Sequence, residues 1–123
     1  MDVTGWGLTT EGSAPAVLQE AQIPIVSNED CEKNYSKIGS GVCLTKRKLC
    51  AGPEIGYEAT CPGDSGGPGL LFDEDSRAYQ VGIVSYGVPP CGPNGLFRIR
   101  NLPGVFTRVT EYLDWIEAII GKF

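Results

Sequence analysis

One short segment of the sequence, Cys61 to Pro68, has residue types that suit nucleophilic catalysis. Ser65 supplies a hydroxyl group, and the glycines around it permit close backbone approaches that a Cβ atom would block. Such a loop can direct successive N–H groups at one point, which is the geometry of an oxyanion hole. Asp64 precedes the serine in a tight turn, where a carboxylate needs a cationic or hydrogen-bonding partner. The segment therefore indicates an attacking oxygen on Ser65 beside a site for developing negative charge.

A serine hydroxyl is a poor nucleophile unless an adjacent base accepts its proton, and histidine is the usual base near neutral pH. The chain contains no histidine, so the usual base for Ser65 is not part of it. Two other interpretations of the loop exist. An isolated Asp-Ser-Gly is typical of a glycine-rich hairpin with an Asx-turn. A phosphate-binding loop fits poorly, because no Lys-Ser or Lys-Thr pair follows the glycines.

The composition is that of a globular protein with one hydrophobic core. The 123 residues include 17 glycines and 9 prolines, which favours short strands and tight turns over long helices. A formal net charge of −5 argues against a nucleic-acid partner, because phosphate binding needs clustered Lys and Arg. No apolar run approaches the roughly 20 residues of a membrane helix, so no membrane partner is expected.

The five cysteines include no C-x-x-C pair, and there is no histidine to complete a zinc site. We therefore expect no metal ion and no other cofactor. Five cysteines in a small glycine-rich domain suit an oxidising compartment, with two disulfides and one thiol left over. The alternative is a set of buried free thiols in a cytosolic protein.

Periodicity predicts several strands and two helices that could position this loop. Residues 20–25 alternate between polar and apolar side chains, which indicates a strand with one buried face. Ser27 followed by acidic residues predicts a short helix through about Tyr35. Further strands are expected at 69–72, 79–86 and 104–109, the first two joined by a polar hairpin at 73–77.

The end of the chain changes to helical spacing. Thr110 can cap a helix, with acidic residues near its positive end and Lys122 near its negative end. We expect the apolar face of this helix to pack into the core. A partner-binding or membrane-surface helix is the alternative, which the lack of basic residues on the polar face disfavours. The apolar face consists of Tyr112, Ile116, Ile119, Ile120 and Phe123.

Eight landmarks follow one another along the chain: Gly5-Trp6-Gly7, Pro24-Ile25-Val26-Ser27, Cys31, Leu49-Cys50-Ala51-Gly52, Cys61 to Pro68, Ser85-Tyr86-Gly87, Cys91, and Pro103 to Val109. In this order, and at nearly this spacing, they resemble the C-terminal half of the trypsin/chymotrypsin family of serine proteases. The resemblance covers essentially the whole chain. It implies an all-β fold in which residues 1–109 form the second β-barrel of a two-barrel protease, and residues 110–123 form a C-terminal α-helix. Residues 1–123 would then be a partial trypsin-like domain.

By this resemblance the chain carries the nucleophile of a serine-type endopeptidase. Ser65 would form the acyl-enzyme, the backbone N–H groups of Gly63 and Ser65 the oxyanion hole, and Asp64 an ion pair with the N-terminal ammonium that zymogen cleavage creates. The family's catalytic His and Asp lie in its N-terminal half, so a missing barrel that carries them is the expected partner. This chain alone is therefore predicted to be inactive. The alternatives are a non-catalytic homologue that acts as a binding or cofactor module, and a fragment without a function of its own.

The resemblance also implies how a protein or peptide substrate would bind. Ser85, Tyr86 and Gly87 would pair with the substrate backbone by strand addition. Trypsin-like members carry an aspartate where this chain has Ala59, and without it a bound Lys or Arg would be a buried, unpaired charge. A large apolar or aromatic residue before the scissile bond is therefore expected, with a small residue as the alternative. The other pocket residues would be Thr60, Pro62 at the rim, and Gly87 with Gly104 in the wall.

Family matching pairs Cys31 with Cys50 and Cys61 with Cys91, and it leaves Cys43 unpaired. Such bridges, like the family itself, imply a secreted protein.

Two further signals have ordinary alternatives. Asn34-Tyr35-Ser36 is a glycosylation sequon, which has meaning only in a secreted protein. The run 46–48 (Lys-Arg-Lys) is expected to be a solvated loop, with proteolytic nicking or contact with an acidic partner as its functional alternatives.

Overall fold

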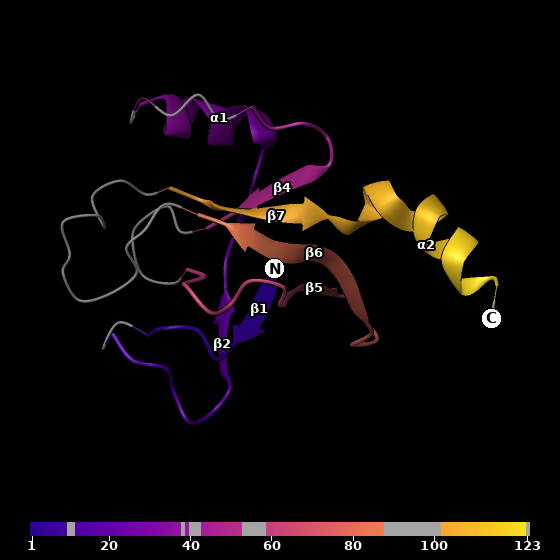
Figure 1. Ribbon diagram of the computed structural model, residues 1–123, viewed down its shortest axis with the longest axis horizontal. Helices are drawn as coiled ribbons and strands as arrows, with labels where there is room; N and C mark the ends of the chain where they lie inside the picture. Colours follow the sequence, from indigo (N-terminus) through magenta and orange to yellow (C-terminus); the bar gives the residue numbers. More distant parts are fainter. Residues whose placement is uncertain (10–11, 38, 40–42, 53–58, 88–101, 123) are drawn as a thin grey trace.

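The computed structural model describes residues 1–9, 12–37, 39, 43–52, 59–87 and 102–122 (Figure 1). Seven strands form one curved sheet, with one helix packed above it and a second extending from one side. The elements, in chain order, are β1 (Asp2–Gly5), β2 (Gln19–Gln22), β3 (Ile25–Val26), α1 (Asn28–Ser36), β4 (Lys48–Ala51), β5 (Pro68–Phe72), β6 (Ala78–Tyr86), β7 (Gly104–Arg108), the 3₁₀ turn η2 (Val109–Tyr112) and α2 (Leu113–Ile120).

The sheet has the strand order β2-β1-β5-β6-β7-β4-β3, and every neighbouring pair is antiparallel. Its two outer strands, β2 and β3, are consecutive in the chain and separated only by Ile23 and Pro24. The Ile23 N–H donates to Met1 O at 2.9 Å, and the Gly52 N–H donates to Pro24 O at 3.0 Å, so backbone pairing continues through this bend. The expected strand at 20–25 is therefore interrupted by a bend at Ile23 and Pro24, which closes the sheet into a barrel. Its expected buried face is wrong in part, because Ile23 is buried whereas Ile25, beyond the bend, is 45% exposed.

Two clusters of buried side chains fill the barrel and the space beneath α1. The first comprises Val3, Ile23, Leu49, Ala51, Val84 and Phe106. The second lies under α1 and comprises Cys31, Tyr35, Leu44, Cys50 and Val105.

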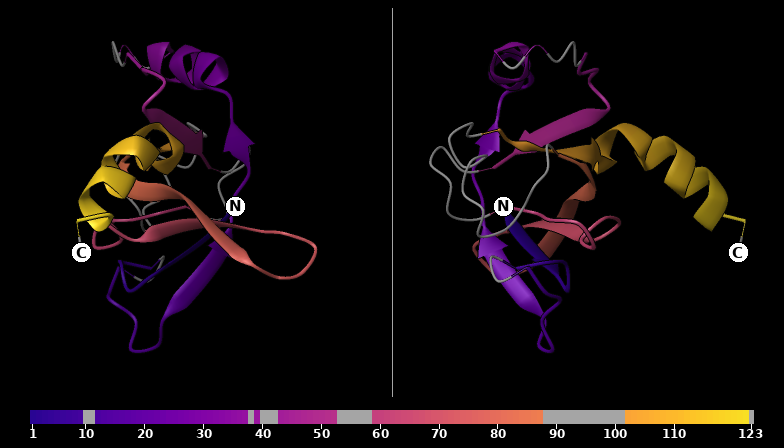
Figure 2. Two further views of the ribbon diagram at one scale, coloured as in Figure 1. Left: turned by 90° about the vertical axis from the view of Figure 1, so that its right-hand side faces the viewer. Right: turned by 60° about the vertical axis from the view of Figure 1, so that its left-hand side comes forward.

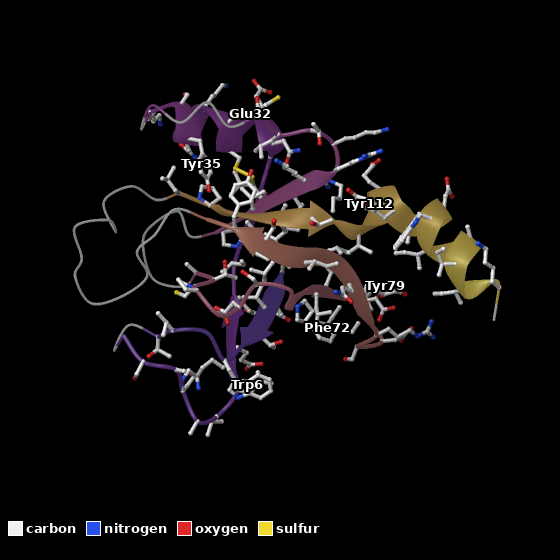
Figure 3. All side chains as sticks on the ribbon, viewed as in Figure 1. Trp6, Glu32, Tyr35, Phe72, Tyr79 and Tyr112 are labelled. Carbon is white, nitrogen blue, oxygen red and sulfur yellow. A yellow bond between two sulfur atoms is a disulfide. The ribbon has the colours of Figure 1, made fainter. Side chains whose placement is uncertain are left out.

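The first helix begins as the sequence predicts. Ser27 is its N-cap, and its Oγ accepts a hydrogen bond from the Asp30 N–H at 3.1 Å. The Cys31–Cys50 disulfide then joins α1 to β4. Figure 3 shows Tyr35 pointing from α1 toward the sheet, where its hydroxyl donates to Pro103 O at 2.6 Å. These contacts fix α1 to the sheet next to the start of β7.

The expected fold class is confirmed, with an antiparallel barrel followed by a C-terminal helix, but the start of that helix differs from expectation. Thr110 is not a cap, because it lies inside the 3₁₀ turn Val109–Tyr112. The α-helix begins only at Leu113, and its N-cap residue, Tyr112, makes no side-chain capping bond. The tight turn carries the chain out of β7 and so delays the α-helix by about one turn.

The apolar face of the C-terminal helix was expected to be buried, and this is wrong for the part that the structure describes. No residue of α2 is buried. Ile119 is 40% exposed and Ile120 is 65% exposed. Figure 1 and the right panel of Figure 2 give the reason, because α2 projects away from the barrel. Phe123 lies outside the described residues. No helix in the described part of the chain is long and apolar enough to cross a membrane.

Candidate active site

The segment around Ser65 folds into two successive turns that share Asp64. The Asp64 N–H donates to Cys61 O at 3.0 Å, and the Gly67 N–H donates to Asp64 O at 3.0 Å. The third residue of each turn is a glycine with positive φ, +98° at Gly63 and +85° at Gly66. A positive φ at this position is the signature of a type II turn, which explains why glycine is needed at both places. Ser65 lies in the second turn and is exposed.

Within the described residues, the carboxylate of Asp64 is held by backbone groups. Its Oδ1 accepts from the Gly7 N–H at 2.8 Å, and its Oδ2 accepts from the Cys61 N–H at 2.9 Å. A Cβ atom at Gly7 would lie 2.5 Å from the Asp64 carboxyl carbon, and one at Gly5 would overlap the same carboxylate. The two glycines of the Gly5-Trp6-Gly7 landmark therefore leave the space that this carboxylate occupies.

The Ser65 turn is also attached to β6 by two backbone hydrogen bonds. The Gly66 N–H donates to Val84 O, and the Val84 N–H donates to Gly67 O, both at 2.9 Å. On its other side the loop is held by the Leu8 N–H, which donates to Pro62 O at 2.9 Å. The nucleophile candidate is thus fixed between β6 and the segment that follows β1.

Three polar groups of this loop remain without a partner in the described part of the chain. They are the Ser65 hydroxyl and the backbone N–H groups of Gly63 and Ser65. Unpaired N–H groups are rare in folded proteins unless solvent or a ligand satisfies them. Gly63 and Ser65 are both exposed, so their N–H groups are open to solvent or to a ligand.

The segment Ser85 to Gly87 has one open edge. Tyr86 pairs with Val105 of β7, and a register shift between Val84 and Tyr86 leaves Ser85 outside that pairing. On the other side, β5 begins only at Pro68, so the ladder between β5 and β6 ends before Ser85. Within the described residues, nothing pairs with this side of residues 85–87, and all three are exposed. An extended peptide could add here as a strand.

Three predicted pocket residues are close together. A Cβ at Gly104 would lie 3.1 Å from Thr60 Oγ1, and a Cβ at Gly87 would lie 3.8 Å from Gly104 Cα. Ala59 and Pro62, the other two predicted pocket residues, are exposed. Residues 53–58 and 88–101 lie outside the described residues, so the pocket is described only on the side formed by these residues.

The segment that precedes Gly104 is anchored from α1. Pro103, which precedes Gly104, is fully buried, and its carbonyl accepts the hydrogen bond from the Tyr35 hydroxyl. Burial raises the pKa of Tyr35 to about 12, with a smaller contribution from the nearby Tyr86. The neutral phenol is therefore the form that the folded protein favours, and as a donor it can keep this bond at physiological pH.

The four cysteines that the structure describes agree with the pairing expected from the family. Cys31 and Cys50 form a disulfide, Cys61 is disulfide-bonded, and Cys43 is free and exposed. Cys91, the expected partner of Cys61, lies outside the described residues.

Two other predicted features have a place in the structure. Asn34 is half-buried on α1, where its Oδ1 accepts from Lys37 Nζ at 3.4 Å. The Met1 ammonium donates to Ile23 O at 3.0 Å. Among the described residues, Asp64 is held by the Gly7 and Cys61 N–H groups and not by an ammonium group. In the described ranges, no three His, Cys, Asp or Glu side chains are arranged to hold a metal ion.

The structure is a closed antiparallel barrel that carries a serine in a glycine-rich turn, beside an open strand edge. This arrangement defines the class of chymotrypsin-fold serine proteases. Sequence comparison gives the family directly: the family model described as Trypsin matches residues 1–116. The chain therefore belongs to the trypsin family of serine proteases.

Three curated relatives are similar to the chain. It is 42% identical over 115 residues to serine proteinase stubble of Drosophila melanogaster, and this alignment covers 93% of this chain and 14% of the relative. It is 40% identical over 120 residues to serine protease filzig of Drosophila melanogaster, and this alignment covers 97% of this chain and 7% of the relative. It is 40% identical over 123 residues to serine protease 41 of Homo sapiens, and this alignment covers 97% of this chain and 36% of the relative. The chain spans about a third or less of the length of these relatives.

The structure adds one functional contact that the sequence interpretation missed. Gly5 and Gly7 served only as landmarks, whereas the Gly7 N–H binds the Asp64 carboxylate. Two glycines around one residue indicate close approach of another group. That pattern could have suggested such a role, but it could not have identified Asp64 as the group that approaches.

Proposed function

We propose that this chain is the nucleophile-bearing part of a serine-type endopeptidase. The observation that carries the proposal is the pair of hydrogen bonds between Val84 and the glycines of the Ser65 turn, because they fix Ser65 beside the open edge of residues 85–87. A peptide that added to this edge would bring a carbonyl group near the serine hydroxyl and near the two unpaired N–H groups. Proximity of this kind is a large part of enzymatic rate enhancement.

The proposed reaction is acyl transfer to Ser65 followed by hydrolysis. The Ser65 oxygen forms a bond to the scissile carbonyl carbon while its proton passes to a base. The Gly63 and Ser65 N–H groups stabilise the negative charge on the carbonyl oxygen. The C–N bond then breaks, the leaving amine takes the proton, and water releases the acyl group from Ser65 by the same steps.

The base must come from outside this chain, since the sequence contains no histidine. We assign it, with its orienting aspartate, to an N-terminal barrel of the family type. The exposed apolar side chains of α2, Leu113, Trp115, Ile119 and Ile120, offer a surface for such a barrel. Without the base, turnover falls by about 10⁶-fold in proteases of this kind, so the isolated chain is inactive.

Activation of the parent protein would involve Asp64. In the proposed zymogen mechanism, a new N-terminal ammonium pairs with this carboxylate, whose oxygens accept backbone N–H groups in the part of the chain that the structure describes. Secretion fits the Cys31–Cys50 disulfide, and the sequon at Asn34 would then be available for glycosylation.

The pocket is proposed to accept a large apolar or aromatic residue. Ala59 offers no carboxylate to a basic side chain, and the glycines Gly87 and Gly104 keep the wall free of side chains. The test joins this chain to a family N-terminal barrel that carries His and Asp, and measures turnover of chromogenic peptides with Phe, Leu, Ala or Arg before the cleavage site. Fastest turnover of the Phe or Leu substrate is expected. Fastest turnover of the Arg substrate contradicts the assignment of the pocket, and a folded hybrid without turnover favours a binding module.

A further inference from the structure

A group of cations lies where the turn before β4 meets the end of β7. It consists of Lys46, Arg47, Lys48 and Arg108, and we call it the basic corner. The Arg108 N–H donates to Arg47 O at 2.7 Å, and Arg108 Nε donates to Lys48 O at 3.2 Å. The corner therefore brings together four of the 10 Lys and Arg residues of a chain whose net charge is −5.

Two of these cations contact aromatic residues, Arg47 over the ring of Tyr112 and Lys48 at the hydroxyl end of Tyr86. The guanidinium carbon of Arg47 is 5.7 Å from the ring centre of Tyr112, which Figure 3 shows at the junction of the sheet and α2. The ammonium group of Lys48 is 5.3 Å from the ring centre of Tyr86, and it donates to the Tyr86 hydroxyl at 3.2 Å. Cation–π contacts of this kind hold long side chains in place. Less conformational entropy is then lost when an anion binds.

The positive charge of the basic corner is largely uncompensated. Lys46 pairs with Glu111 at 3.7 Å, and its side chain is 81% exposed, so this pair is weak. In the described part of the chain, Arg47, Lys48 and Arg108 have no carboxylate within ion-pair distance. The corner thus carries about three net positive charges.

The chemistry of this surface limits its partner. In the described part of the chain, the groups that this corner presents are mainly cations, with Arg47 over the ring of Tyr112 and Lys48 at the hydroxyl of Tyr86. Protein partners usually bind through buried aromatic or apolar anchors, whereas most of the described groups of this surface are charged. A polymer with closely spaced anions gains its affinity from released counterions and needs no such pocket.

We propose that the basic corner binds a sulfated polysaccharide. Nucleic acid is a poorer fit, because a rigid duplex carries about one charge per 1.7 Å and would bring many of them against the acidic remainder of the chain. A flexible polysaccharide can place a few sulfate groups against Arg47, Lys48 and Arg108 and turn away. Planar guanidinium groups suit two-point contact with such oxyanions.

The test measures binding of the 123-residue chain to a heparin oligosaccharide by surface plasmon resonance at several salt concentrations. We expect binding that weakens by about 20-fold to 40-fold between roughly 50 and 200 mM NaCl, as for release of about three ions. The variant Lys46→Gln/Arg47→Gln should weaken binding by about tenfold. The matched control, Lys33→Gln/Lys37→Gln on α1, removes the same charge elsewhere and should leave binding within about twofold. Circular dichroism establishes that each variant is folded.

Three results would overturn the proposal. The first is absence of heparin binding at about 50 mM NaCl. The second is equal loss of binding in the α1 control, which would mean attraction without a defined site. The third is tighter binding of a DNA duplex or of polyglutamate than of heparin, which would assign the corner to nucleic acid or to an acidic polypeptide.

Discussion

The carboxylate of Asp64 accepts a hydrogen bond from the Gly7 N–H across 57 residues of sequence, at 2.8 Å. This contact ties the turn that carries Ser65 to the end of β1, and the opposing bond from Cys61 closes the turn from the other side. The position of the nucleophile candidate therefore depends on two glycines that carry no chemistry of their own.

The first prediction concerns the space around this carboxylate. Gly7→Ala should lower the free energy of unfolding by about 3 kcal/mol, because the new Cβ would lie 2.5 Å from the Asp64 carboxyl carbon. Gly87→Ala is the matched control, since its Cβ would make only ordinary contact at 3.8 Å. Urea denaturation followed by fluorescence measures both. Equal stability of the two variants would mean that the carboxylate does not need this space.

The second prediction concerns Tyr35 at alkaline pH. Its pKa is raised to about 12, so the folded state favours the neutral phenol. The resulting stability is fully present below the usual tyrosine pKa of about 10, and is lost as the pH rises from there to about 12. The free energy of unfolding should fall by about 2 kcal/mol over this interval. Denaturation curves at a series of pH values measure it.

Tyr35→Phe provides the control, because it has no ionisable phenol. Its unfolding free energy should lack this part of the alkaline decrease, so that the two proteins converge above about pH 12. At neutral pH the variant should be about 1–2 kcal/mol less stable, since the buried Pro103 carbonyl loses its donor. Parallel pH profiles for the two proteins would rule out Tyr35 as the titrating group.

The third prediction concerns the bridge between α1 and β4. The double variant Cys31→Ala/Cys50→Ala should lower the free energy of unfolding by about 3 kcal/mol, because the disulfide closes a loop across 19 positions in the unfolded chain. Cys43→Ser, at the exposed free cysteine, should change it by less than about 0.5 kcal/mol. Thermal and urea unfolding under non-reducing conditions make the comparison. A loss below about 1 kcal/mol in the double variant would show that the bridge adds little.

The fourth prediction concerns the exposed helix. Trp115 and Ile120 are each 65% exposed on α2, so the chain should self-associate at high concentration. Trp115→Glu/Ile120→Lys should shift the sedimentation coefficient toward that of the monomer, while Glu117→Gln on the same helix should not. A strictly monomeric unmodified chain at high concentration would refute the prediction.

Much of the barrel could be predicted from short-range patterns, and the family landmarks supplied its connectivity. Ser27 indicated the start of α1, and alternating residues with turn signals indicated β5 and β6 to within about one residue. Such features depend on neighbours along the chain, which a sequence displays directly.

What the sequence could not show depends on distant or absent groups. The contact between Gly7 and Asp64 joins segments that no local pattern connects. The apolar face of α2 led to the expectation that the helix packs into the core, and this is wrong for the described residues because the helix projects away from the barrel. Thr110 is a good capping residue by type, and it fails as a cap because the 3₁₀ turn after β7 places it one turn too early.

The central claim is that Ser65 is a nucleophile that lacks its base in this chain. Labelling with a fluorophosphonate probe, followed by mass spectrometry of the modified peptide, tests it most directly. The account predicts no labelling of the isolated chain, and labelling at Ser65 once a barrel with His and Asp precedes residue 1. The Ser65→Ala form of that hybrid should stay unlabelled. Labelling of Ser65 in the isolated chain, or a folded hybrid that reacts only elsewhere, would contradict the claim.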